Sequence, residues 1–366
     1  MKGRVLQFGL LVVLVSLGVA AAPLGLCDYV SPQTDLRHLS LSASYRHFVD
    51  GSGGGADVSG GRAALDFGQL YDSPDIGFTL AGSAEVLLAD FLPTGGLGET
   101  LGTFRYFLSA DLPFFGFGGI ETSLASTQSQ PRVHVSAGMG YGRFSDVTPL
   151  AKAFRISNEL LKAKAISQPL GDSVRMALAK AIGTKYASVK DQIADVVNQI
   201  QSAAAVTLTA RQVLIVEDVV LATGDERRCG WSIQAGVGYK LLDPFGAPQD
   251  LLVTASADAA LAPDPAGQLL FRTSVSGPLD LLNENTLTAH ASYDYVLSDT
   301  SSLRLTYSLQ HLQPRGGPAS TSHAAAALVG FAVGRANVGL QLSLSKGAAD
   351  PAWSLDASIS VAMSLL

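Results

Sequence analysis

The sequence predicts an all-β transmembrane antiparallel β-barrel of about 14 strands, interrupted by a small inserted α-helical bundle. Three observations support this fold class. Apolar and polar residues alternate along most of the chain, as they do in strands with one apolar and one polar face. Hydrophobic residues make up 47% of the 366 residues, yet after residue 22 no unbroken apolar run is long enough for a membrane-spanning helix. Between residues 147 and 224 the apolar spacing changes to every third or fourth residue.

The start of the chain, residues 1–21, has the pattern of a cleaved secretory signal peptide. Two basic residues precede a short apolar run over 5–19, and three alanines follow it. We place the cleavage after Ala20 or Ala21. Residues 22–36 are then expected to form a periplasmic N-terminal segment ahead of the first strand.

Strands are clearest near the C-terminus, where alternation is unbroken over 303–310, 337–345 and 353–363. The same pattern predicts barrel strands 1–6 within 37–146 and strands 7–14 within 225–366. Their lengths suit strands that cross a bilayer at a tilt.

A soluble sandwich or barrel would show the same alternation, but three features favour the membrane. Aromatic residues stand near the ends of the apolar faces, as at a lipid–water interface. Charged residues occur on the polar faces. Tight turns alternate with longer links rich in Gly, Pro and Ser, for which we take 51–60, 92–100 and 313–321.

The charged residues and histidines on the polar faces are the candidate pore-lining residues. Their density suits a water-filled lumen better than a dry core. Because both signs are mixed, we expect weak ion selectivity. The candidates are Arg46, Glu85, Arg105, Asp111, Glu121, His134, Lys240, Asp258, Arg272, His290, Asp294, Arg304 and Asp356.

The interval 147–224 predicts four amphipathic helices that bury their apolar stripes against one another. Thr148 is the expected N-cap of the first helix, with Pro149 at its first position. Counting strands from a periplasmic N-terminus puts this insertion in the periplasm, as a cap or gate. Six of the nine lysines lie in it. They indicate either an electrostatic contact with an acidic surface or simply a solvated helical face.

The same strand count puts both cysteines, Cys27 and Cys229, on the periplasmic side, so we predict that they form a disulfide. Lipid attachment at Cys27 is the alternative, although a bulky leucine stands where lipobox sequences have a small residue. A near-repeat of glycines over 137–142 and 235–240 either bends the sheet or offers a flat platform to the bundle.

The signal peptide, the alternating strands and the last strand, 353–366, resemble those of bacterial outer-membrane β-barrel proteins of the porin-like kind. The stretch 140–155, "GYGRFSDVTPLAKAFR", is similar to an element of uncharacterised bacterial barrels with a helical insertion. The resemblance implies location in the bacterial cell outer membrane, contact with its lipid and insertion by the barrel-assembly machinery. Such barrels often end in Phe, whereas this chain ends in Leu366.

The leading hypothesis is an outer-membrane pore for small hydrophilic solutes, gated or partly occluded by the helical insertion. The alternative is a structural barrel whose bundle docks the cell wall or a periplasmic partner protein. We expect no enzyme, because the sequence has no zinc-ligand spacing, phosphate loop or nucleophile elbow. His290 and Asp294 stand about 13 Å apart along one strand, too far to act together. No cofactor, metal or nucleic-acid partner is expected.

Overall fold

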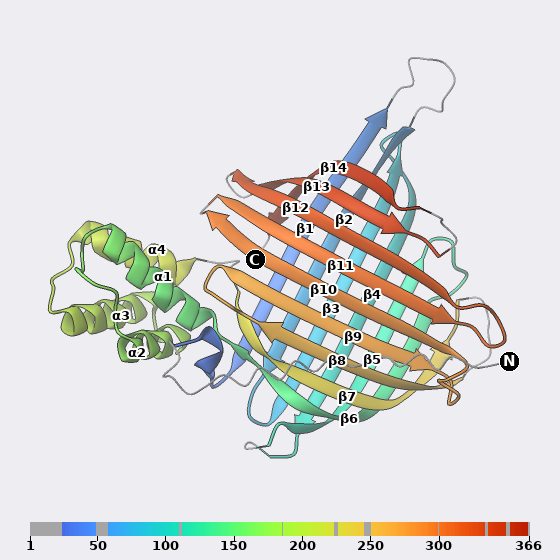
Figure 1. Ribbon diagram of the computed structural model, residues 1–366, viewed down its shortest axis with the longest axis horizontal. Coiled ribbons are helices and arrows are strands. Elements are labelled where there is room, and N and C mark those ends of the chain that lie inside the picture. The colour runs from blue at the N-terminus through green and yellow to red at the C-terminus, as the bar shows by residue number, and fades with distance from the viewer. Residues whose placement is uncertain are drawn as a thin grey trace, which may run out of the picture.

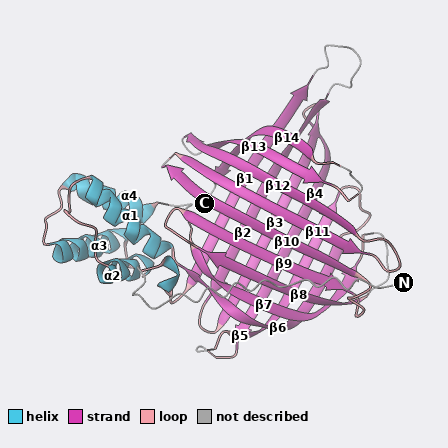
Figure 2. Ribbon diagram, viewed as in Figure 1, coloured by secondary structure: helices cyan, strands magenta, loops and turns pink. Residues whose placement is uncertain are grey.

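The computed structural model describes residues 24–48, 58–109, 112–184, 186–222, 226–244, 250–298, 300–333, 336–348 and 352–364. The predicted signal peptide lies outside these residues, and so do Asp111 and Leu366. The described chain forms one barrel and one group of helices (Figures 1 and 2).

Fourteen strands carry the barrel. Their bounds are β1 (Thr34–Phe48), β2 (Val58–Asp72), β3 (Ile76–Ala89), β4 (Leu92–Phe107), β5 (Phe114–Ala125), β6 (Arg132–Asp146), β7 (Arg228–Leu242), β8 (Leu251–Leu261), β9 (Gly267–Gly277), β10 (Asn285–Ser298), β11 (Ser301–Gln313), β12 (Ser320–Val333), β13 (Ala336–Lys346) and β14 (Ser354–Ser364).

Each strand pairs antiparallel with the next one in the sequence, and β14 closes the ring against β1. The predicted all-β antiparallel barrel with an inserted helical bundle is therefore confirmed, with 14 strands in the described chain. The closing seam is short. Among the described residues, β1 pairs residue by residue with β2 along its whole length, but with β14 only over Ser40–Ala43.

The two ends of the barrel differ in their connections. We call the end at which β6 stops and β7 starts the bundle end, and the opposite one the far end. At the bundle end β2–β3 and β8–β9 are joined by short turns, 73–75 and 262–266. The links at the far end are mostly longer. The predicted long link over 92–100 is wrong, because β4 begins at Leu92 after a two-residue turn.

That turn, Asp90 and Phe91, explains the error. Both residues have positive φ, 49° and 63°, which is the geometry of a tight hairpin turn. Glycine is the usual residue for such a conformation, and neither position has it. The glycines instead lie within β4, and their presence there led to the prediction of a loop.

The helical insertion consists of α1 (Thr148–Lys162), α2 (Asp172–Gly183), α3 (Val189–Ala204) and α4 (Ala210–Leu221). Their apolar stripes form one core, whose fully buried members include Leu150, Ile156, Leu160, Leu178, Val196, Ile200 and Val216. A short 3-10 helix, η1 (Leu26–Asp28), completes this core with Leu26 and Tyr29. The segment before β1 thus belongs to the helical unit, a role that the sequence did not predict.

Helix α1 begins one residue earlier than predicted. Thr148 lies inside the helix and Val147 is its N-cap. The carboxylate of Asp146 accepts a hydrogen bond from the Thr148 N–H at 2.8 Å, so the last residue of β6 supplies the capping oxygen.

The four helices lie beyond the bundle end of the barrel and outside its ring of strands (Figure 1). In the described part of the chain, none of the helices has the length and apolar character needed to cross a bilayer.

Candidate functional site

The outward side chains of the barrel form an apolar surface. Strand alternation turns large apolar residues outward on every part of the ring, and these side chains are exposed. Aromatic rings lie near both ends of the strands, and at the far end the Tyr45 and Phe91 rings are stacked with centroids 4.0 Å apart. The next pair lies toward the bundle end. The Tyr141 and Trp231 ring centroids are 5.6 Å apart. Exposed apolar side chains on the outer face include Leu80, Phe104, Ile120, Met139, Ile233, Val237, Phe271, Leu305, Leu340, Leu342 and Ile359.

The inward side chains surround a cavity of about 750 Å³ inside the barrel. Serine, threonine and charged side chains share its wall with apolar ones, so the cavity is of mixed character, whereas the outer face of the barrel is apolar. Within the described ranges, no group of three or more His, Cys, Asp or Glu side chains is arranged to hold a metal ion. Seven of the predicted pore-lining residues line the cavity: Arg105, Glu121, His134, Lys240, Asp258, Arg272 and His290.

The other predicted residues are more scattered. Asp294 forms an ion pair with Arg304 on the neighbouring strand, and Glu85 pairs with Arg62 at 3.8 Å. Asp356 stands opposite Ser343 in the β13–β14 register. Arg46 lies on β1, but its side chain is not among those described. Asp111 lies outside the described residues.

Several lumen charges are paired across neighbouring strands. Arg272 contacts Asp258 at 2.5 Å, and Glu121 has both Arg132 at 3.6 Å and His134 at 3.9 Å. Arg132 was not predicted as a lumen residue, although it has the same alternation as His134. Opposite charges on adjacent strands stabilise the sheet and cancel one another's field.

At the bundle end, the lumen side of β2–β6 is filled by aromatic rings. Phe115 is 0% exposed and Phe107 is 3% exposed, and their ring centroids are 5.6 Å apart. The glycines of β6 make room for them. A Cβ atom at Gly140 would stand 2.4 Å from Phe115 Cζ, and one at Gly138 would stand 2.7 Å from Phe117 Cε1. Rings of β5, and not the helical bundle, therefore cover this glycine run.

A buried ion pair lies in the same filled region. Arg105 Nη2 is 3.1 Å from Asp72 Oδ1, and their side chains are 5% and 1% exposed. Arg105, a predicted pore-lining residue, contributes to the cavity wall, but its side chain is almost fully buried. The Arg105 guanidinium also lies 5.8 Å from the centre of the Phe115 ring, so an aromatic side chain covers the buried pair on this side.

Opposite walls of the barrel touch at the bundle end. Thr34 of β1 donates its hydroxyl to the Phe144 carbonyl of β6 at 3.3 Å and accepts the Asp146 N–H at 2.9 Å. Leu36, Leu70, Phe144 and Ala260 pack together in one apolar cluster from β1, β2, β6 and β8. We call this contact across the lumen the neck. It narrows the barrel interior at this end.

Two backbone features produce the neck. Gly142 and Gly230 have φ of +120° and +130°, so β6 and β7 change direction close to the bundle end of the barrel. The first residues of β1 extend past the last described residue of β14, Ser364, which pairs with Ser40. In this part of β1, the Arg37 N–H donates to Oε1 of Glu226, which lies just before β7, at 3.3 Å.

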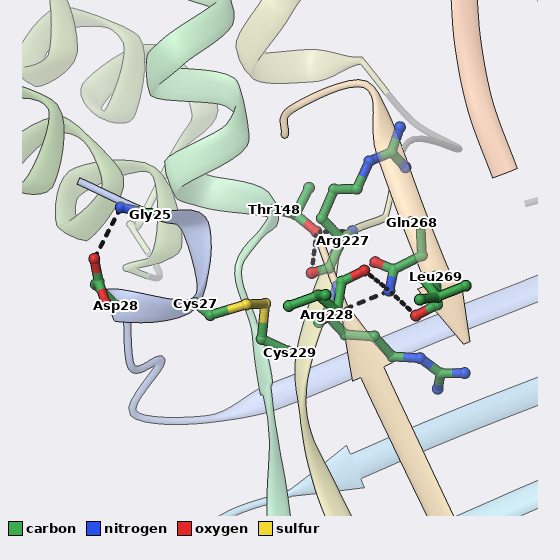
Figure 3. Close-up of a disulfide and its surroundings, with 10 residues drawn as sticks. Gly25, Cys27, Asp28, Thr148, Arg227, Arg228, Cys229, Gln268 and Leu269 are labelled. Atoms are coloured by element: carbon green, nitrogen blue, oxygen red, sulfur yellow. Dashed lines mark hydrogen bonds between the residues drawn. A yellow bond between two sulfur atoms is a disulfide. The ribbon is translucent and has the colours of Figure 1, made fainter. Parts of the chain in front are cut away.

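The helical unit is fastened to the barrel beside the neck (Figure 3). A disulfide joins Cys27 of η1 to Cys229 of β7, the pair that the sequence predicted. The buried Arg227 donates to the carbonyls of Pro265 and Ala266 in the β8–β9 turn, at 3.2 and 3.0 Å. Its backbone N–H donates to Thr148 Oγ1 at 2.9 Å, which ties the end of the insertion to its start.

Tyr29 is the second fastening point. Its hydroxyl donates to the Ala179 carbonyl of α2 at 3.3 Å. Burial, and then the nearby carboxylate of Asp146, raises the pKa of Tyr29 above its usual value. The phenol is therefore a neutral donor within the helical core.

No protein-family model and no curated protein matches the chain. Solved structures similar to it include a triple mutant of Rhodopseudomonas blastica porin, with 9% identity and a TM-score of 0.30 over 91% of this chain and 100% of that one. Pseudomonas aeruginosa OpdK with vanillate has 11% identity and a TM-score of 0.34 over 91% and 98%. The Acinetobacter baumannii outer membrane protein Omp33 has 8% identity and a TM-score of 0.34 over 92% and 97%.

Proposed function

We propose that the chain forms a pore in the bacterial outer membrane through which small hydrophilic solutes pass. The observation that carries the proposal is the radial order of the barrel: an apolar outer face, a closed ring of paired strands, and a cavity of about 750 Å³ whose wall carries charged and hydroxyl side chains. A closed barrel is one of the two structures whose backbone hydrogen bonds are all satisfied within lipid.

Planar-bilayer recordings on the purified mature chain test this function. We expect discrete conductance steps from protein that migrates on a gel in a folded, heat-modifiable form. Folded protein that remains monodisperse without detergent and produces no steps would reject the pore. The behaviour of the protein without detergent tests its membrane placement, and the conductance steps test whether it forms a pore.

We place the bundle end and its helices in the periplasm, and the signal peptide is the exporting element. Disulfides form and persist in that oxidising compartment, which suits the Cys27–Cys229 link. Short turns at the bundle end and longer links at the far end also match the usual periplasmic and external sides of such barrels.

Gating by the helical insertion is the finer part of the proposal. The helices are anchored through Thr148, Arg227 and Cys229, directly beside the neck residues Phe144 and Asp146. A displacement of the bundle would therefore pull on β6 and β7 where they form the neck. We propose that the bundle controls the neck through these anchors, without entering the lumen itself.

Replacing residues 149–225 by a short Gly-Asn-Gly linker tests the gate. Val147 and Arg227 stay hydrogen-bonded neighbours in that variant, so the β6–β7 hairpin is kept. We expect a larger or more frequently open conductance. An unchanged current would reject control by the bundle and leave the pore proposal intact.

The docking of cell wall or of a periplasmic partner protein is the second candidate. Residues 147–224 contain nine basic and six acidic side chains, and Leu214 and Leu221 of α4 are exposed on the bundle. Retention of the full-length protein on peptidoglycan, lost when the surface lysines of α1–α3 are changed to Gln, would support it. Equal recovery of the wild type and the lysine variant in the unbound fraction would reject charge-dependent binding to peptidoglycan.

A further inference from the structure

The backbone of Arg228, the first residue of β7, is held in place by a side chain of β9. Its backbone N–H donates to Gln268 Oε1 at 2.8 Å, and Gln268 Nε2 donates back to its carbonyl at 3.1 Å. Gln268 is itself 5% exposed and also donates to the Leu261 carbonyl. The next residue is Cys229, which the disulfide fixes. The backbone of Arg228 is therefore fixed in position, because both of its chain neighbours and Gln268 of β9 hold it.

The guanidinium of Arg228 has no ion-pair partner among the described residues, and the same holds for Lys240 elsewhere in the cavity wall. Arg228 differs in this from the other arginines of the barrel lumen. Arg62, Arg105, Arg132, Arg272 and Arg304 each have a carboxylate within ion-pair distance. Arg228 instead extends away from the helices (Figure 3), lines the barrel cavity and lies 6.0 Å from the centre of the Phe144 ring. A cation without a partner attracts anions, whereas the paired charges around it largely cancel.

The closest acidic residue along the chain, Glu226, is committed elsewhere. Its carboxylate accepts the Arg37 N–H at 3.3 Å. Burial raises the pKa of Glu226, and the carboxylates of Asp146 and Asp35 raise it further, against the opposing effect of the Arg37 hydrogen bond and of Arg228. Glu226 is therefore more readily protonated than an ordinary glutamate, which weakens its hold on Arg228.

Apolar side chains line the cavity next to this cation. The cavity wall includes the neck residues Leu70, Phe144 and Ala260, and Leu270, which packs against them. A solute with a charged end and an apolar body would thus find a partner for each part: the guanidinium of Arg228 for the charged end, and the neck for the apolar body.

We propose that Arg228 is the solute-binding cation of the pore and that it selects small organic anions carrying a carboxylate on a compact apolar body. The inference rests on the proposed pore function and adds its solute class. A carboxylate can accept two parallel N–H bonds from one guanidinium, which gives both affinity and orientation.

Benzoate is the probe, with neutral benzamide as its uncharged control. In titration calorimetry on detergent-purified full-length protein, we expect benzoate to bind, benzamide to bind at least about tenfold more weakly, and Arg228→Gln to weaken benzoate by a similar factor. The matched control is the double variant Arg272→Gln/Asp258→Asn, which removes a neutral pair from the same cavity and should leave benzoate affinity unchanged. Equal affinity of the wild type and Arg228→Gln would overturn the proposal.

Bilayer recordings give a second readout. In a KCl gradient, Arg228→Gln should lower the chloride-to-potassium permeability ratio and relieve block by benzoate, while Arg228→Lys should keep the ratio. Channels with the wild-type ratio and block in Arg228→Gln would contradict the anion site alone. Absence of any channel would instead contradict the pore, and the calorimetric comparison would still decide whether Arg228 binds the anion.

Discussion

The two sides of the barrel lumen each contain an arginine–aspartate pair, but they surround it with different side chains. At the bundle end, the lumen face of β2–β6 is filled by Phe107, Phe115 and Phe117 around a buried Arg105–Asp72 pair. The lumen face of β7–β14, which we call the open side, carries hydroxyls, small residues and exposed ion pairs. Arg272 is 57% exposed there, against 5% for Arg105. An arginine paired with an aspartate is thus a structural element on one side and part of a wetted wall on the other.

The difference shows that lumen charge alone does not define a conducting surface. Both ion pairs come from inward positions of alternating strands, and their surroundings decide their role. Where glycines of β6 let rings approach the wall, water is excluded and the pair stabilises the neck. Where serine and threonine surround the pair, its charges stay screened and accessible.

The largest effect should come from breaking the buried pair. Arg105→Ala leaves Asp72 charged and buried, which costs about 3–5 kcal/mol. We expect a marked drop in the urea concentration at which the barrel loses its folded gel mobility. Arg272→Ala is the matched control and should cost about 0–1 kcal/mol, since that pair is exposed. Similar midpoints for the two variants would remove the distinction between the sides.

Opening the filled side should enlarge the pore. Phe115→Ala removes a fully buried ring beside Gly140 and should cost about 3 kcal/mol, with higher single-channel conductance. Leu124→Ala lies on the same strand, faces outward and should leave the conductance unchanged. A wild-type conductance in Phe115→Ala would mean that solutes pass only along the open side.

The disulfide should matter for the helices and little for the strands. Cys27→Ser/Cys229→Ser releases η1 from β7, and removal of such a link typically costs about 2–4 kcal/mol. For a helical unit of this size, we expect melting followed by circular dichroism at 222 nm to shift down by roughly 10–20 °C. Heat-modifiable gel mobility reports the barrel and should be nearly unaffected. Loss of both signals together would indicate one cooperative unit.

The smallest effect concerns a helix cap far from the lumen. Ser188 accepts the Asp191 N–H at 3.2 Å as the N-cap of α3. Ser188→Ala should cost about 1 kcal/mol and lower the helical melting temperature by roughly 4–8 °C. Conductance should stay at the wild-type value, and any change in it would show that bundle stability alone is transmitted to the neck.

Much of this architecture could be predicted from period alone. Alternation predicts fourteen strands because each strand has one face in an apolar surrounding and one in a polar one. The disulfide followed from strand parity, which places Cys27 and Cys229 at the same end of the barrel. The β4 boundary was wrong because Asp90 and Phe91 adopt positive φ without glycine, and local composition gives no sign of that.

The candidate site was predictable only as a list of inward residues. Alternation identifies Arg105, Arg272 and Arg304 as equivalent, and cannot tell that rings bury the first of them. The neck depends on contacts between β1 and β6, which are not neighbours in the sheet. Arg228 has the alternation of Ser232 and Gln234, but it was not among the predicted pore-lining residues.

The link between Cys27 and Cys229 also has a bearing on biogenesis. Leu26 and Tyr29, next to Cys27, help to form the helical core, and this core needs no pairing of barrel strands. If the chain is exported as proposed above, the helices and the segment around Cys27 can join before the barrel strands enter a bilayer. β6 and β7 would then already lie side by side, as a preformed hairpin from which the ring can grow in both directions.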